Sequence, residues 1–359
     1  MNSSILNDAR LEFMHDILGH DHFLANIARS LSTGRMHHAW LLSGPVGIGK
    51  ASMARLAAAW LLSESTQSEA LFGLEHSNIK IDEQDVGSNL VLKATHPDCK
   101  IISPQAEENK SGQIKIDQIR ELLPFMMHKP ARCGWRVAII DSMDDVNRNG
   151  ANALLKILEE PPDQAVIFLI ASHIGSLPST IPSRCRLVRM SRLAPNVCMA
   201  ALRSIWPSVD NERLEILGKM SRGAPGLAVK LADSGAADFY QAVCALFKST
   251  PLARTELAEL CAKWGGGTGA GRELRLGSVF CICRLLRYSA LRATNVKTDD
   301  LCDFEIPVVE RLASSHTAEQ LARFHDEFVI NFAKAERLFL EFSRLLERHL
   351  VKIFEKTLP

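Results

Sequence analysis

The N-terminal half of the sequence, residues 18–189, alternates short apolar runs with segments of helical spacing. Residues 39–42 form an apolar run that stops at Gly44, and apolar residues then recur at helical spacing from Lys50 to Leu61. Strands that alternate with helices predict a parallel sheet with helices on both faces, a three-layer α/β fold. The further short apolar runs that we expect to be strands are residues 100–102, 137–140 and 166–171.

Two other segments of this half have their own patterns. A helix is predicted over residues 149–160, and it has to end at Pro161-Pro162, because proline cannot continue a helix. Residues 63 to about 93 are polar and poorly periodic. We expect them to form a long surface insertion.

The pattern becomes helical beyond Arg192. Residues 195–235 predict a small helical bundle, and a glycine-rich linker follows at residues 265–271. The apolar spacing over residues 316–354 predicts one long final helix. We therefore expect an α/β domain at residues 1–190, a helical lid at 191–240 and a helical oligomerisation domain at 241–359.

Composition narrows the class of protein. With 359 residues, 47% of them hydrophobic, the chain is large enough for two or three well-packed domains. A net charge of +1 argues against a protein that coats DNA. The nine cysteines lack metal or disulfide spacing, which is typical of free thiols in a reducing cytosol. There is neither a signal-peptide pattern nor an apolar run of roughly 18 residues, so we expect no membrane association and a cytoplasmic location.

The segment from Gly44 to Ser52 carries the clearest chemical motif. Its sequence, GPVGIGKAS, fits the phosphate-binding pattern G-x-x-x-x-G-K between a strand and a helix. Gly44, Gly47 and Gly49 would let backbone N–H groups turn toward phosphate oxygens, and Lys50 would reach the outer phosphates. The sequence therefore predicts a nucleotide-binding fold.

The motif departs from the pattern at its last position. A serine or threonine hydroxyl after the lysine normally binds Mg²⁺, but Ala51 has no oxygen. Ser52 comes one residue later and points about 100° away on a helix. We expect the loop to accept phosphates with an impaired metal site.

A second departure lies at the end of the expected strand 137–140. Asp141 stands where P-loop nucleoside triphosphatases place a Mg²⁺-binding acid. The next residue is Ser142, where AAA+ ATPases usually have a glutamate that activates water, and a serine is no base at neutral pH. Asp144 and Asp145 are expected to be solvated or to cap a turn. Together these residues predict that ATP binds weakly or not at all and is not hydrolysed.

Three blocks of sequence carry a family resemblance. Residues 37–45 (HHAWLLSGP), 152–162 (NALLKILEEPP) and 177–185 (LPSTIPSRC) resemble, in the same order, segments of bacterial clamp-loader subunits of the AAA+ class. The resemblance spans about residues 18–235. It implies an AAA+ α/β domain, a helical lid and a helical collar that assembles a ring.

The resemblance also separates the kinds of subunit. ATP-hydrolysing tau/gamma members should carry a hydroxyl at 51, Glu at 142 and an arginine in the helix after 223, where this chain has Gly226. Delta members normally lack the Ser-Arg-Cys motif. The departures resemble the delta-prime type, which implies that Arg184 acts in trans as an arginine finger on a neighbour's ATP. Ser172 falls where the family has a nucleotide sensor, although a strand-end serine can also be a plain turn residue.

Several alternatives stay open for these residues. The chain could be an active tau/gamma-like ATPase, or a scaffold in which Arg184 is idle. Arg184 could also form an internal salt bridge, or join Arg186 and Arg189 in a weak patch for the phosphate backbone of DNA.

The resemblance finally implies partners and raises the question of a metal. Expected ring partners are the tau/gamma and delta subunits, with the sliding clamp contacted indirectly and primed DNA through the assembled complex.

Family members usually bind zinc with four cysteines after the P-loop helix. Residues 62–98 contain no cysteine and Cys99 stands alone, so we expect no zinc.

Overall fold

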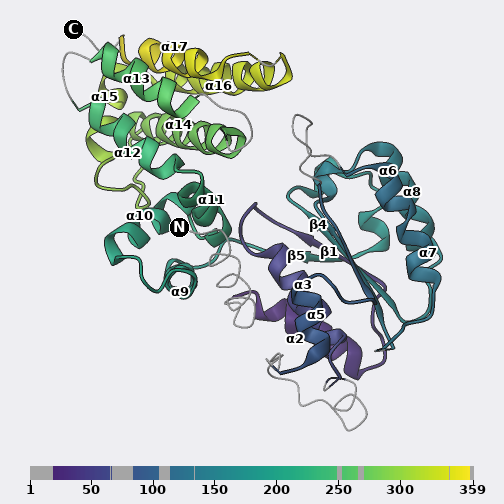
Figure 1. Ribbon diagram of the computed structural model, residues 1–359. Helices are drawn as coiled ribbons and strands as arrows, with labels where there is room; N and C mark the ends of the chain where they lie inside the picture. The colour runs from purple at the N-terminus through teal and green to yellow at the C-terminus, as the bar shows by residue number, and fades with distance from the viewer. Residues whose placement is uncertain are drawn as a thin grey trace. The chain divides into compact units, whose positions relative to one another are not determined.

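A computed structural model of the chain describes residues 19–64, 66, 84–104, 114–132, 134–248, 253–265, 271–338 and 340–355. The chain divides into two compact units (Figure 1). The first, the α/β unit, comprises residues 1–209 and 223–226. The second, the helical unit, comprises residues 210–222 and 227–359. None of the described helices is long and apolar enough to cross a membrane.

A five-stranded parallel sheet forms the centre of the α/β unit, in the order β2-β3-β4-β1-β5. Every residue of β1 and of β4 is buried, which is why these strands are continuous apolar runs rather than alternating ones. The parallel sheet predicted from the sequence is confirmed. The strands are β1 (Ala39–Ser43), β2 (Cys99–Ile102), β3 (Arg136–Asp141), β4 (Ala165–Ala171) and β5 (Arg186–Arg189).

Helices cover both faces of this sheet, and so complete the three layers (Figure 1). One face packs its apolar side chains against α6, α7 and α8, in a single buried cluster. On the other face, the Phe23 ring makes edge contacts with Trp40 of β1 and Phe168 of β4. The helices of the unit are α2 (Asp21–Ser32), α3 (Lys50–Leu61), α5 (Val86–Leu92), α6 (Ile116–Arg120), α7 (Leu122–Met127), α8 (Arg148–Glu159) and α9 (Pro195–Ile205), with short 3-10 helices η1 (Met143–Asp145), η2 (Ile174–Ser176) and η3 (Pro182–Arg184).

Two segments of the α/β unit differ from the expectation. The polar insertion predicted for residues 63–93 is wrong for its last part, because α5 packs on α3 and buries Val91 and Leu92. Asp85 caps this helix by accepting the Ser88 N–H at 2.6 Å. Residue 65 and residues 67–83 of the insertion lie outside the described residues. The strand β5 was not expected at all, since short, charged edge strands carry little apolar signal.

The helical unit is organised around α14, which packs against α12, α15 and α16, while α13 packs against α17. The single long helix predicted for residues 316–354 is wrong. The chain turns between α16 and α17, and the Phe332 and Phe342 rings meet edge to face at 5.5 Å. Turning back lets α17 pack against α13 while α16 packs against α14, and the two helices also contact each other. The helices are α10 (Asn211–Ser221), α11 (Pro225–Asp233), α12 (Ala236–Leu246), α13 (Arg254–Gly265), α14 (Gly271–Ala293), α15 (Ile306–Ser315), α16 (Ala318–Leu338) and α17 (Phe342–Glu355).

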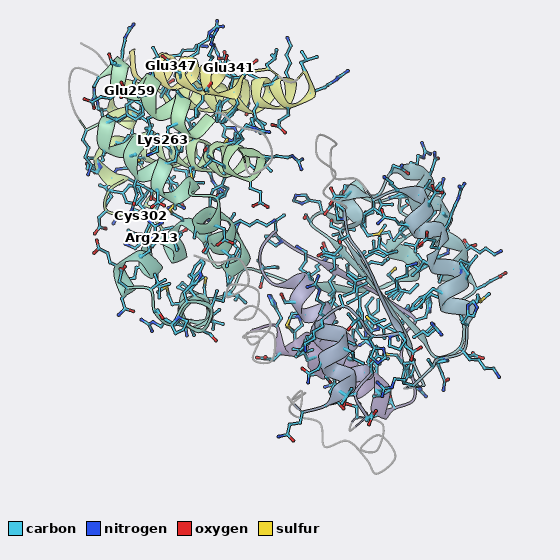
Figure 2. All side chains as sticks on the ribbon, in the orientation of Figure 1. Arg213, Glu259, Lys263, Cys302, Glu341 and Glu347 are labelled. Atoms are coloured by element: carbon cyan, nitrogen blue, oxygen red, sulfur yellow. The ribbon has the colours of Figure 1, made fainter. Side chains whose placement is uncertain are left out.

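Polar contacts also tie α10 to the rest of the helical unit. Arg213 pairs with Asp238 of α12 at 2.6 Å, and the Cys302 thiol donates to the Ile216 carbonyl at 3.8 Å (Arg213 and Cys302 are labelled in Figure 2). The Cys302 contact therefore joins a helix predicted to belong to the lid to a segment predicted to belong to the collar, whereas Asp238 falls within the predicted lid. The division into three domains stays a prediction.

Candidate functional site

The P-loop follows β1 and leads directly into α3, in the strand–loop–helix order expected from the sequence. Gly47 and Gly49 have φ of 81° and 99°, a left-handed conformation that favours glycine. At Gly44 a Cβ atom would lie 2.1 Å from the Met190 carbonyl oxygen, so only glycine fits. These three glycines shape the loop for close approach to an anion.

Lys50 begins α3, and its side chain folds back over the loop. Its Nζ donates to the carbonyl oxygens of Gly44 and Pro45, at 2.6 and 2.7 Å, and the residue is only 6% exposed. Carbonyls of the loop therefore already hold the amine that the motif assigns to the outer phosphates. A phosphate would share this ammonium, which has three N–H donors, with the two carbonyls.

Gly226, near the start of α11, contacts the same loop. Its N–H donates to the Gly47 carbonyl at 2.8 Å, and a Cβ at this position would lie 3.0 Å from that oxygen. The His20 ring Nε2 lies 3.2 Å from the Ile48 carbonyl, and burial lowers the pKa of this histidine. The position at which the resemblance implies an arginine in ATP-hydrolysing members is thus in direct backbone contact with the P-loop.

The carboxyl end of β3 carries a compact hydrogen-bond network centred on Asp144. Its carboxylate accepts the Ser172 N–H at 2.6 Å, the Ser142 hydroxyl at 2.8 Å and the Ser176 hydroxyl at 3.2 Å. Burial alone would raise the pKa of Asp144, but these hydrogen bonds outweigh it and lower the pKa below its ordinary value. Asp144, expected to be solvated or capping, instead joins the end of β3 to the end of β4.

This network also places two residues singled out in the sequence. Ser142, next to Asp141, caps η1 by accepting the Asp144 N–H at 3.0 Å. Ser172 binds Asp144 through its backbone, and its contact with a nucleotide stays a prediction. The role of Asp144 escaped sequence reasoning, because nothing in the pattern links it to a serine 28 positions away.

A cavity of about 380 Å³ lies beside this network. Met143, Val146 and Leu177 supply apolar lining, and Asp144 and Arg148 supply opposite charges. No P-loop residue of the described chain lines it. The cavity is therefore separate from the phosphate-binding loop.

Arg184 lies at the end of η3, just before β5. Its Nη1 donates to the Thr180 carbonyl at 3.1 Å and the Ser183 hydroxyl at 3.3 Å, and its Nη2 pairs with the Glu159 carboxylate at 2.9 Å. The side chain remains 36% exposed. The internal salt bridge weighed as an alternative is present, and it is a surface one.

The patch suggested for Arg184, Arg186 and Arg189 does not form a single surface. Arg186 and Arg189 are three residues apart on β5, so they point to opposite faces of the sheet. The Arg186 guanidinium lies over the Trp40 ring at 4.6 Å and donates to the Ser30 hydroxyl at 2.9 Å. Arg186 is thus engaged in packing of the α/β unit.

No group of three or more metal-binding side chains occurs within the described part of the chain. Burial raises the pKa of the Cys99 thiol to about 12. His96 is buried and accepts the Asp98 N–H through Nδ1 at 3.0 Å, while His76 lies outside the described residues. The absence of zinc stays a prediction.

The fold and these motifs agree with comparisons to known proteins. The family model described as "DNA polymerase III, delta subunit" matches residues 19–194. The chain is 33% identical over 200 residues to DNA polymerase III subunit delta' of Pseudomonas aeruginosa, which covers 55% of this chain and 56% of that one. It is 31% identical over 226 residues to subunit tau of Escherichia coli, which covers 62% of this chain and 33% of that one.

A third relative, subunit delta' of Yersinia pestis, is 29% identical over 252 residues, 69% of this chain and 70% of that one. The match spans a third to about two thirds of the length of these three relatives. The five-stranded parallel sheet with its P-loop after β1 is the AAA+ fold that the resemblance implied, and that prediction is confirmed. Through residues 19–194, the chain belongs to the family of DNA polymerase III clamp-loader subunits.

Proposed function

We propose that the chain is a delta-prime-type clamp-loader subunit, which does not hydrolyse ATP itself and donates Arg184 to the ATP site of a neighbouring subunit. In this role it would help to load a sliding clamp on primed DNA. One observation carries the proposal. Ala51 and Ser142 stand where an active ATPase has a metal-binding hydroxyl and a water-activating carboxylate, and the same unit presents an arginine at its surface.

The two losses act on different parts of the reaction. Ala51, the second residue of α3, lacks the hydroxyl that would bind Mg²⁺, so the charge developing on the phosphates would lack part of its metal clamp. Ser142 gives its hydroxyl to Asp144 and cannot activate water. Each loss alone would lower the rate of ATP hydrolysis. Together they leave a site that keeps Lys50 and Asp141 but lacks both the metal-binding hydroxyl and the water-activating carboxylate.

The packing around the P-loop supports weak nucleotide binding as well. Lys50 is bonded to two loop carbonyls, and Gly226 bonds to a third, that of Gly47. A phosphate would have to share the Lys50 ammonium, which has three N–H donors, with the first two of these carbonyls. We therefore propose that ATP occupies this site weakly or not at all.

Arg184 has the chemistry that a trans-acting group requires. A guanidinium is charged at every physiological pH and presents a planar fork of donors that matches phosphate oxygens. The side chain is partly exposed and lies next to an edge strand, where a neighbouring subunit can reach it. Tau/gamma and delta are the proposed ring neighbours, and the cytoplasm is the proposed location.

A tau/gamma-like ATPase is the second candidate. It is favoured by the 31% identity to a tau subunit and by the retained Lys50 and Asp141. The two candidates differ in what the isolated chain does with ATP. Only an active ATPase would turn it over with Mg²⁺.

The test measures Mg²⁺-dependent ATP turnover and nucleotide binding by the isolated full-length chain, beside its Lys50→Ala variant. We expect no turnover from either protein and weak or undetectable binding. Turnover that Lys50→Ala abolishes would establish the tau/gamma-like ATPase instead. Co-purification of the wild-type chain with tau/gamma and delta, measured beside these assays, would show that the protein is competent to assemble.

A further inference from the structure

The contact between Arg184 and Glu159 links two segments 25 positions apart in the sequence. Glu159 is the last residue of α8, and Arg184 is the last residue of η3. Their side chains pair at 2.9 Å, with Glu159 50% exposed. Both therefore sit at the surface of the α/β unit, where a neighbouring molecule can approach them.

The backbones beneath this pair are anchored in the core of the α/β unit. Ile157 and Leu158 of α8 and Ile181 of the loop before η3 belong to one buried cluster. The Leu158 carbonyl lies 3.1 Å from the Nε2 of His38, and Pro161 follows directly and prevents the helix from continuing. A shared core thus fixes the distance between the two side chains.

The contacts orient the guanidinium without using all of its donors. Thr180 and Ser183 accept from Nη1, and Glu159 accepts from Nη2. Arginine has five N–H donors in a planar fork, and these contacts engage at most three of them. The remaining donors can meet a phosphate while Glu159 holds the plane of the fork.

We propose that Glu159 is a positioning residue for Arg184, which holds the guanidinium in the orientation needed to reach the neighbour's γ-phosphate. This inference rests on the proposed role of Arg184 in trans. An ordered arginine loses less side-chain freedom when the transition state forms, so its effect on the rate is larger than that of a mobile one.

The test is a double-mutant cycle in the reconstituted clamp loader, with clamp and primed DNA present. The variants are Glu159→Gln, Arg184→Ala and the double variant, with Glu160→Gln as a control that removes the same charge from the adjacent exposed residue. Gel filtration checks that each ring is assembled. The readouts are kcat and KM for ATP.

We expect Glu159→Gln to lower kcat roughly two- to five-fold, the rate equivalent of an exposed ion pair, with little change in KM. In the Arg184→Ala background the same substitution should change nothing, because the group that it positions is gone. Glu160→Gln should match wild type. Glu159→Asp, which keeps the charge, should recover part of the loss.

Three results would overturn the inference. Wild-type kcat in Glu159→Gln, beside a reduced kcat in Arg184→Ala, removes the role of Glu159 and leaves that of Arg184. An equal loss from Glu159→Gln in both backgrounds shows a purely structural effect. A wild-type rate in Arg184→Ala rejects the proposed function itself, and the inference with it.

Discussion

One arginine–glutamate pair of the α/β unit and one of the helical unit differ sharply in exposure. In the α/β unit, Arg184 and Glu159 are 36% and 50% exposed and meet through a single contact. In the helical unit, the side chains of Arg284 and Glu305 are 3% and 0% exposed and meet through two, at 2.7 and 3.0 Å. Exposure keeps the first arginine available to another molecule, whereas burial commits the second to the fold.

The buried pair is also the centre of a larger network. Glu305 accepts from the Tyr240 hydroxyl at 2.7 Å and from the Cys302 N–H at 2.6 Å. Arg284 donates to the Lys219 carbonyl of α10 at 3.3 Å. Burial raises the pKa of Tyr240 well above its ordinary value, so its hydroxyl remains a donor. One charge pair thereby joins α10, α12, α14 and the start of α15.

The largest expected effect comes from breaking this network. Glu305→Ala leaves the Arg284 guanidinium buried and unpaired, which should lower the free energy of unfolding of the helical unit by about 3–5 kcal/mol. Glu310→Ala removes the exposed partner of Arg292 and should cost about 0–1 kcal/mol. Urea unfolding, with hydrogen exchange followed in α12, α14 and α15, measures both. Equal losses would show that burial does not distinguish the two kinds of pair.

A smaller effect is expected where the P-loop meets the strand ends. Gly44→Ala places a Cβ 2.1 Å from the Met190 carbonyl and should destabilise the α/β unit by about 1–3 kcal/mol, with no effect on the helical unit. Gly175 has no neighbouring atom within 4 Å of such a Cβ, so Gly175→Ala should stay within about 0.5 kcal/mol. Hydrogen exchange in β1 and α3 is the measurement. A Gly44→Ala protein as stable as Gly175→Ala would contradict this packing.

Acidification should also act unequally on the two units. Burial lowers the pKa of His20, His38 and His96 in the α/β unit, and of His349 in the helical unit. In the unfolded chain these histidines take up a proton near pH 6.5, whereas in the folded chain they do so only at lower pH. Protons therefore bind the unfolded state preferentially, and the folded state loses stability as the pH falls below about 6.5. The α/β unit should therefore lose more stability between pH 7.5 and pH 5.

Urea unfolding at the two pH values, with exchange resolved by segment, tests this difference. His38→Gln combined with His96→Gln should flatten the pH dependence of the α/β unit and leave that of the helical unit unchanged. Equal acid sensitivity in both units would contradict the assignment.

The sequence predicted the elements whose burial is continuous and missed those held by distant contacts. The strands β1, β3 and β4 were predictable, because buried parallel strands are uninterrupted apolar runs. The turn between α16 and α17 was not, since no glycine or proline interrupts residues 318–355 and only tertiary packing bends the chain there.

The same distinction holds for the candidate site. The P-loop pattern singled out Lys50, the end of an apolar run singled out Asp141, and the family resemblance singled out Arg184, and their roles stay predictions. The bridging role of Asp144 and the pairing of Arg184 with Glu159 depend on contacts 25 or more positions apart. Local periodicity contains no trace of such contacts.

The most direct measurement compares Lys50→Ala and Arg184→Ala in the reconstituted clamp loader, as ATP turnover with clamp and primed DNA. Arginine fingers contribute roughly 10³–10⁵-fold at the site that they serve, and the overall loss should be smaller, because other sites in the ring remain intact. We predict an assembled Arg184→Ala ring with clearly reduced turnover, and a Lys50→Ala ring close to wild type. Wild-type turnover with Arg184→Ala, together with a loss in Lys50→Ala, would show that this chain works through its own ATP site.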